Sequence, residues 1–220
     1  MVSRLGIVAS IAIVLVGSLV GSVRSQPPVG TSIYSVQVDP RLCPSPLCGG
    51  YWVALANGAR THCADGSSNG RCYVARAVDE HRHPLPVGIP GGALARATLD
   101  SFDFDGHGRL GMLVVAAVYA PAGTATLTGG FYRVVDTGIR CVRAPCFSYR
   151  ATQVNGSTRT TVSSLDLEAA QATAAEVARA EAALRTKNGL YARGRFATSP
   201  DGGRVFRPSR LYLRATRPRA

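Results

Sequence analysis

The chain has 220 residues, of which 46% are apolar and 17% are charged, and its formal net charge is +12 at pH 7. This balance excludes an intrinsically disordered or fibrous chain, and the length is that of one or two domains. The basic excess comes almost entirely from arginine, because Lys187 is the single lysine.

The first 25 residues have the pattern of a secretory signal peptide. A short basic segment ends at Arg4, an apolar run extends from Leu5 to Val20, and small residues precede a cut after Ser25. We therefore expect a protein exported to an extracellular or periplasmic compartment. The alternative is an uncleaved signal that anchors the protein to a membrane, since the apolar run is nearly long enough to span a bilayer.

An internal repeat organises the rest of the sequence. Residues 43–58 align without a gap on residues 141–156, so that two cysteines, a tyrosine and an Asn-Gly pair coincide, and Ala95-Arg96 matches Ala192-Arg193 further on. The repeat predicts two domains, residues 26–125 and residues 126–220, with a linker of small residues near their boundary.

In chain order, the first copy shows strand patterns and no helix. Tyr51, Val53 and Leu55 share one face of the second strand, and Asn57-Gly58 marks a tight hairpin after it. A cysteine-bearing insertion then predicts a further, stapled hairpin. The expected strands are 34–39, 51–55, 72–78, 94–99 and 110–119.

The second copy repeats this order but has a helix at about 166–187 where the first has a proline-rich loop. Asp166 is the expected N-cap of the helix. Its apolar stripe consists of Leu167, Ala170, Ala174, Val177 and Leu184. The last three strands expected in this copy are 159–163, 190–196 and 211–215.

Each copy therefore has three strands, a loop or helix, and two more strands. This is the element order of an OB-type barrel. The predicted fold class is mostly β with one helix (α+β), arranged as two tandem small barrel-like domains. The alternative for each copy is a small twisted sheet capped by the helix.

The repeat also restricts how the six cysteines pair. The second copy holds only Cys141 and Cys146, so these two pair, and by equivalence Cys43 pairs with Cys48. Cys63 and Cys72 remain for each other inside the insertion. The alternative is a four-thiolate zinc site built from the two short pairs, which export disfavours because thiolates oxidise outside the cell.

Around these cysteines the chain resembles an uncharacterised family of secreted bacterial domains. The motifs are Asp39-Pro-Arg-Leu-Cys43-Pro-Ser-Pro-Leu-Cys48-Gly-Gly-Tyr51, the segment from Thr61 to Ala75, and the segment from Gly138 to Cys146. The resemblance implies a protein exported from a bacterium. It implies no known activity, so no functional residue carries over from it.

The sequence shows no catalytic constellation. No serine lies in a Gly-x-Ser-x-Gly elbow, and all four histidines fall in the first copy. We therefore expect a protein that is not an enzyme and needs no cofactor. His81 and His83, beside Asp79 and Glu80, are the candidate metal ligands, with a metal-dependent enzyme as the corresponding alternative, but a solvated loop before Pro84 explains them more simply.

Four arginines near the C-terminus, and a fifth in the second cysteine loop, are candidate binding residues. The densest charge near the C-terminus predicts an anion-binding face made by Arg204, Arg207, Arg210 and Arg214. Arg143 lies in the second cysteine loop, where it would suit the acidic pocket of a protease that this loop inhibits.

The function predicted from the sequence is that of a secreted, non-catalytic binding or structural protein of unknown ligand. The alternatives are a polyanion-binding module, a secreted protease inhibitor and a metal-dependent enzyme. The expected partner is an anionic surface polymer or a secreted protein, and nucleic acid is disfavoured.

Overall fold

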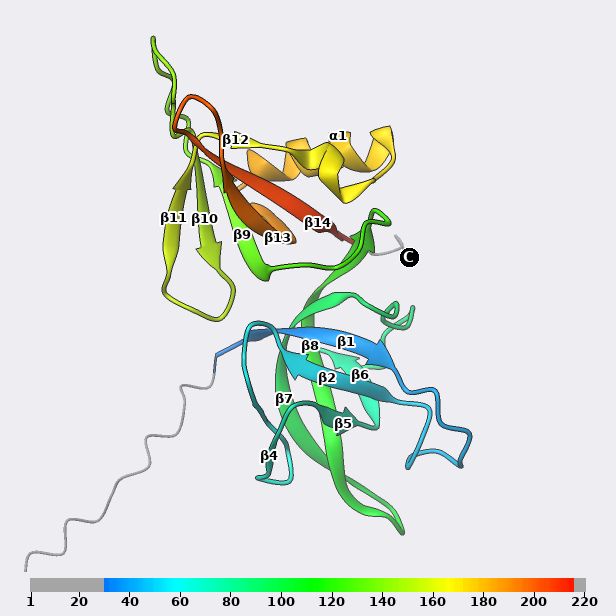
Figure 1. The fold of residues 1–220 in the computed structure, drawn as a ribbon. Coiled ribbons are helices and arrows are strands. Elements are labelled where there is room, and N and C mark those ends of the chain that lie inside the picture. The colour runs from blue at the N-terminus through cyan, green and yellow to red at the C-terminus, as the bar shows by residue number, and fades with distance from the viewer. Residues whose placement is uncertain (1–29, 216–220) are drawn as a thin grey trace, which may run out of the picture.

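The computed structural model describes residues 30–215, which are mostly β-strand with one α-helix (Figure 1). Twelve strands belong to one sheet, and two short strands form a separate small sheet. The predicted mostly β class with one helix is confirmed. The predicted signal peptide, residues 1–25, lies outside the described residues.

The first half of the described chain contains the eight strands in the lower part of Figure 1. They are β1 (Ser32–Val38), β2 (Tyr51–Leu55), β3 (Thr61–His62), β4 (Ser68–Asn69), β5 (Cys72–Val74), β6 (Arg76–Asp79), β7 (Leu94–Phe104) and β8 (Gly108–Ala122). The stapled hairpin predicted in the insertion is present as β3 and β4, which pair with each other alone.

The second half contains the remaining strands and both helical segments. They are β9 (Gly130–Asp136), β10 (Tyr149–Gln153), β11 (Arg159–Val162), β12 (Ser164–Leu165), the 3₁₀ helix η1 (Leu167–Ala170), α1 (Ala174–Leu184), β13 (Leu190–Thr198) and β14 (Arg204–Arg214). The predicted linker is shorter than expected, because β8 continues to Ala122 and β9 begins at Gly130.

Strand order is the same in the two halves. The sheet runs β11-β10-β9-β13-β14-β8-β7-β1-β2-β5, so each half reads third, second, first, fourth and fifth long strand from its outer end to the middle. The halves join where β14 pairs with β8, from Leu211 opposite Ala122 to Arg214 opposite Tyr119. In each half a short strand, β6 or β12, also pairs in parallel with the fifth strand.

The strands of residues 30–215 form no closed barrel, and each half is instead a strongly bent part of one sheet. The reason is that the third strand breaks where it changes partner. β5 pairs with β2, the chain turns at Ala75, whose N–H donates to the Gly111 carbonyl, and β6 then pairs with β8. The same break occurs at Ser163 between β11 and β12. Gly111 allows the close approach, because a Cβ there would lie 2.5 Å from the Tyr73 carbonyl oxygen.

Three apolar clusters hold this sheet. One lies inside the first half around Val36, Val53 and Leu113, and another inside the second half, where α1 and η1 cover it through Leu184 and Leu167. The third cluster, the seam, lies between the halves and takes residues from both. Its members are Ile33, Ala56, Leu94, Ala117, Tyr119, Val154 and Tyr212, with Phe131 and Tyr191 packed against it.

The prediction of a single helix over residues 166–187 is wrong in one respect, because the structure has two separate helical segments there, η1 and α1. Asp166 caps η1 as expected, but Gln171 has a left-handed backbone (φ 53°) that ends this turn. Thr173 then starts α1 with a capping box, in which its hydroxyl accepts from the Glu176 N–H and the Glu176 carboxylate accepts from the Thr173 N–H. The break rotates the second segment, so Ala180 is buried and Ala174 is exposed.

Two asparagines link the halves in a reciprocal way. Asn57 and Asn155 both have a positive φ, 63° and 55°, as expected for tight Asn-Gly hairpins. The Asn57 amide donates to the carbonyls of Phe131 (2.7 Å) and Val154 (3.0 Å) in the second half, and its oxygen accepts from the Phe131 N–H. The sequence pattern predicted the turn but not these contacts.

Asn155 makes the mirror set of contacts to the first half. Its amide donates to the carbonyls of Ile33 (2.7 Å) and Ala56 (2.9 Å), and its oxygen accepts from the Ile33 N–H (3.0 Å). The asparagine at each hairpin tip therefore forms hydrogen bonds with backbone groups at the start of the other half's first strand. The two exchanges flank the seam and fix its alignment.

We expect the substitution Asn57→Gly to destabilise the protein by about 1–3 kcal/mol, because glycine keeps the positive φ but removes the three cross-half hydrogen bonds. Urea unfolding of the purified protein measures the change. Asn69→Gly is the matched control, since Asn69 bonds only within its own hairpin region. Equal midpoints for the Asn57 and Asn69 variants would contradict this role of the amide.

Candidate functional site

The structure joins the cysteines in the predicted pairs. Cys43–Cys48 closes the loop between β1 and β2, Cys141–Cys146 closes the loop between β9 and β10, and Cys63–Cys72 ties the β3–β4 hairpin to β5. The Cα atoms of these three pairs are 5.3, 5.5 and 5.4 Å apart, in that order. Because every sulfur is bonded to another, none remains as a thiolate for the alternative zinc site.

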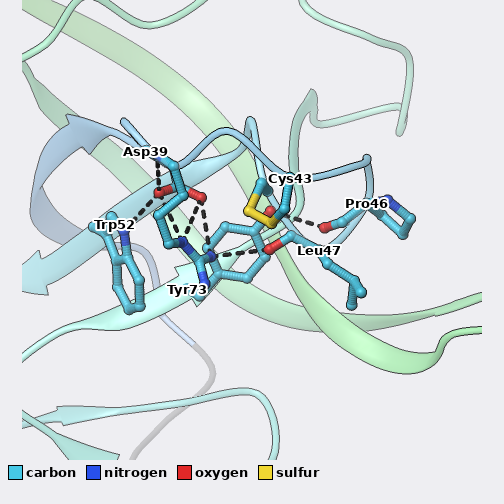
Figure 2. The surroundings of a disulfide bond; sticks show 8 residues. Asp39, Cys43, Pro46, Leu47, Trp52 and Tyr73 are labelled. Carbon is cyan, nitrogen blue, oxygen red and sulfur yellow. Dashed lines mark hydrogen bonds and ion pairs between the residues drawn. A yellow bond between two sulfur atoms is a disulfide. The ribbon is translucent and has the colours of Figure 1, made fainter.

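The first disulfide loop is held by a buried carboxylate (Figure 2). Asp39 follows β1, and its side chain is 0% exposed. It accepts hydrogen bonds from the Arg41 backbone N–H (3.2 Å), from the Arg41 guanidinium (2.9 Å at Nη2) and from the Trp52 indole N–H (3.2 Å). The bonds from Arg41 lower the pKa of Asp39 to about 2, so this carboxylate is ionised at neutral pH.

Arg41 then packs on two aromatic rings. Its guanidinium carbon lies 5.1 Å from the ring centre of Trp52 and 4.9 Å from that of Tyr73. Arg41 Nη2 also donates to the Leu47 carbonyl (2.9 Å), and the Tyr73 hydroxyl donates to the Pro46 carbonyl (2.8 Å). In Figure 2 the disulfide lies beside the Tyr73 ring, and dashed lines join Tyr73 to Pro46 and Trp52 to Asp39.

The second disulfide loop has the same ion pair without the rings. Arg140 donates to both oxygens of Asp136, at 3.1 and 2.8 Å, and this lowers the pKa of Asp136 to about 2. At the place aligned with Trp52 the second half has Arg150, which is exposed. The aromatic platform is therefore a property of the first half alone.

A groove of about 270 Å³ lies beside this platform. We call it the Trp52 groove; it is bounded by β2, β5, the β3–β4 hairpin and the start of β8. The polar and aromatic side chains that line it include those of Trp52, Asp65, Asn69, Arg71, Tyr73 and Arg109. The Arg71 guanidinium carbon lies 4.8 Å from the ring centre of Trp52, so this indole has guanidinium groups from two arginines close to it.

A second groove, of about 430 Å³, surrounds the disulfide of the second half. It is lined by Arg140, Pro145, Tyr149 and several serines, and the Ser199 hydroxyl in it donates to the Asp201 carboxylate. This bond and one from the Gly203 N–H lower the pKa of Asp201. The aspartate therefore serves the β13–β14 turn.

The predicted metal ligands, His81 and His83, lie in an exposed turn after β6. Asp79 accepts hydrogen bonds from the backbone N–H groups of both histidines, and His83 Nδ1 lies 3.7 Å from its carboxylate. Within residues 30–215 no group of three or more histidine, cysteine or acidic side chains is arranged to hold a metal ion. The aspartate shapes the turn.

The four arginines predicted as one anion-binding face do not share a face. Phe206, Leu211 and Leu213 of β14 point into the second-half core. Side chains alternate along the strand, with a β-bulge between Phe206 and Leu211. Arg204 therefore lies on the core side with Phe206, whereas the opposite side carries Arg207, Arg210 and Arg214. Arg210 is also occupied, because it donates to the carbonyls of Gly123 and Ala125.

The structure adds two arginines that the sequence analysis did not include. Arg195 lies opposite Arg207 and Arg193 lies opposite Arg210. The strands β13 and β14 therefore carry two cross-strand arginine pairs, with the Gly194–Pro208 pair between them. Arg207 also contacts the Asp166 carboxylate, at 3.3 Å. Arg143, the predicted binding residue of the second disulfide loop, is exposed beside the fully exposed Val142.

The sequence analysis also missed the Trp52 groove. A signal for it was present, because Tyr51, Val53 and Leu55 were predicted to share one face of their strand, and alternation then leaves the only tryptophan on the opposite face. Arg71 and Tyr73 alternate in the same way around the buried Cys72. What the pattern did not contain was that Arg109, at the start of β8, lines the same groove.

The family model described as "Domain of unknown function (DUF6748)" matches residues 32–217, and the chain belongs to this family. Among curated proteins and among solved structures there is no significant match to the chain. None of the helices in residues 30–215 is long and apolar enough to cross a membrane.

We expect the substitution Asp39→Asn to lower the melting temperature above about pH 4, and this difference from the wild type to shrink as the pH falls toward 2. Asp39 has a folded-state pKa of about 2, below its ordinary value of 3.8, so its stabilising effect is present at higher pH and is lost on protonation. Calorimetric melting from pH 2 to pH 6 tests this. A pH-independent difference would contradict it.

Proposed function

We propose that this member of the DUF6748 family is an exported, disulfide-stapled protein that binds a ligand without catalysing a reaction, and that the ligand binds in the Trp52 groove. The observation that carries the proposal is the placement of the only tryptophan of the chain, with Tyr73 and two guanidinium groups, on an outer strand face beside a groove. Aromatic rings with a few polar groups around a concavity are typical of ligand sites.

Both walls of the groove are held before a ligand arrives. The Cys63–Cys72 disulfide fixes the β3–β4 hairpin on one side, and the Asp39–Arg41 pair fixes Trp52 and Tyr73 on the other. A site of this kind loses little conformational entropy on binding. This supports a binding role for the staples beyond stabilising a small fold.

The charges in the groove support binding rather than catalysis. Asp65 is the only carboxylate among the lining residues, and hydrogen bonds from Ser67 lower its pKa. A general base works best with a pKa near the operating pH, so this aspartate is poorly matched to proton transfer at neutral pH.

The arrangement of the strands supports the same location. The matching strand order of the two halves, the parallel pairs made by β6 and β12, and the register shifts at Arg96 and at Arg193 favour two copies of one OB-type unit. OB-type units bind oligonucleotides and oligosaccharides on the face of strands 2 and 3, between two loops. In the first half this face is that of Trp52 on β2 and Tyr73 on β5.

Export rests on the signal pattern of residues 1–25 and on the disulfides, which persist in oxidising compartments. The Asp39 to Tyr51 motif, whose ion pair and disulfide hold the first loop, is on this proposal the hallmark segment of the family.

A second candidate function is polyanion binding on β13 and β14. It is favoured by the arginine pairs, since like charges directly opposite each other destabilise a sheet. Its test is retention on a heparin column. If the pairs bind the polymer, Arg195→Ala with Arg207→Ala lowers the salt needed for elution; unchanged elution would remove this candidate.

For the exported protein we expect an intact mass that corresponds to a chain starting at Gln26. On reduction this mass should rise by two hydrogens per disulfide. Non-reduced peptide mapping should then recover the pairs Cys43–Cys48, Cys63–Cys72 and Cys141–Cys146. A mass that retains residues 1–25, or cysteines that alkylate without reduction, would contradict the export proposal.

We also expect ligand binding to change the fluorescence of the protein, because Trp52 is the only tryptophan. A panel of neutral and acidic oligosaccharides, an oligothymidylate and mixed peptides is titrated into the folded protein. At least one probe should give a saturable change, and its affinity should fall at least about tenfold with Arg71→Ala. If no probe does so, the groove is not a ligand site for these classes.

A further inference from the structure

Arg71 and Arg109 present positive charge to the Trp52 groove. Among residues 30–215 neither arginine makes an ion pair, and both are exposed at the groove wall. Arg109 donates only to the Ser101 hydroxyl, whereas the guanidinium of Arg71 rests on Trp52. Arg41, by contrast, is paired with Asp39. The groove is therefore built to receive an anionic group.

The same groove also presents hydrogen-bond acceptors. Asp65 accepts from the Ser67 N–H with one carboxylate oxygen (2.9 Å), and its lowered pKa keeps it ionised. The Asn69 side chain amide donates to the Ser67 hydroxyl, which leaves its oxygen as an acceptor. These oxygens suit hydroxyl groups on a ligand and repel a second anion. The ligand must therefore combine an acid with neutral hydroxyls nearby.

The two guanidinium groups that cover Trp52 favour an acidic sugar over a nucleic acid as the ligand. Base stacking requires a bare aromatic face, whereas guanidinium groups already lie 5.1 and 4.8 Å from the centre of this ring. A stacked base would have to displace Arg71. An acidic sugar would need no displacement, because its carboxylate would bind the guanidinium where it lies, and its ring carbons would face Tyr73 and Leu110, which line the groove.

The size of the groove agrees with a short segment of such a ligand. Its volume of about 270 Å³ lies just below the range of drug-sized ligand pockets, which is about 300–1,000 Å³. A ring-sized group fits inside it, and the rest of a longer chain would continue over the surface. Arg60, which donates to the Ser68 carbonyl on the hairpin wall, adds positive charge nearby.

From these four observations we infer that the Trp52 groove binds a short acidic oligosaccharide of the uronic acid class. Arg71 and Arg109 bind the sugar carboxylate, and Asp65 and Asn69 accept hydrogen bonds from the sugar hydroxyls. This inference rests on the proposed function and names its ligand class.

The test compares charged and neutral forms of the same sugar. Trimers of galacturonate, mannuronate and glucuronate, and the methyl ester of each, are titrated into the full protein while Trp52 fluorescence and calorimetric heat are recorded. We expect at least one acidic trimer to bind saturably. Its methyl ester should bind at least about tenfold more weakly, because it loses the charge-assisted hydrogen bonds to arginine.

Variants localise the effect. Arg71→Ala and Arg109→Ala should each weaken binding of the acidic trimer at least about tenfold, whereas Arg150→Ala should leave it unchanged. Arg150 is a matched control, because it is an exposed arginine in the second half at the position aligned with Trp52. Circular dichroism melting establishes that each variant is folded.

The outcomes separate the two proposals. Equal binding of acid and ester, or tighter binding of an oligothymidylate that Arg71→Ala weakens, would overturn the ligand class and leave the groove as the binding site. Acidic trimers that bind with no loss in the Arg71 and Arg109 variants would overturn the assignment of the groove. If no member of the earlier probe panel binds either, the proposed function fails together with this inference.

Discussion

The exchange of asparagine side chains between the halves is the constraint on which the rest of the structure depends. Each half leaves the outer face of its first and fourth strands uncovered, and the seam buries these faces against each other. Apolar packing alone is non-directional, so it does not choose one alignment. Asn57 and Asn155 supply direction, because each satisfies backbone groups of the other half's first strand and so fixes how β8 meets β14.

Within this shared frame, the two halves differ in what they present to solvent. The second half covers its core with η1 and α1, whereas the first uses an irregular loop that buries Ile89. Both halves hold a disulfide loop with an aspartate–arginine pair, Asp39 with Arg41 and Asp136 with Arg140. Only the first adds aromatic rings and the β3–β4 hairpin, and these two additions together make the Trp52 groove. The difference between the halves thus coincides with the groove that we propose as the ligand site.

Local patterns predicted much of the chain and failed where a partner changes. Alternation identified Tyr51, Val53 and Leu55 as one inner face, and Asp166 was read correctly as a cap. The fifth strand of the second half was expected at 211–215 but begins at Arg204, because the bulge near Pro208 interrupts the alternation. The helix break at Gln171 was missed, since a left-handed glutamine has no sequence signature. The predicted barrel is not closed within the described residues, because the third strand breaks at Ala75, where it changes partner from β2 to β8.

The sequence by itself determined the order of the long strands, the mostly β class and the pairing of nearby cysteines, because each of these depends on residues a few positions apart. It also determined that Tyr51, Val53 and Leu55 share one face of their strand. Only the tertiary structure decided that Tyr73, Arg71 and Arg109 gather around Trp52 and that Arg204 lies away from Arg207. The physical reason is that a strand's own residues set which way its side chains point, whereas its neighbours are set by long-range pairing and by the turns and bulges that redirect it.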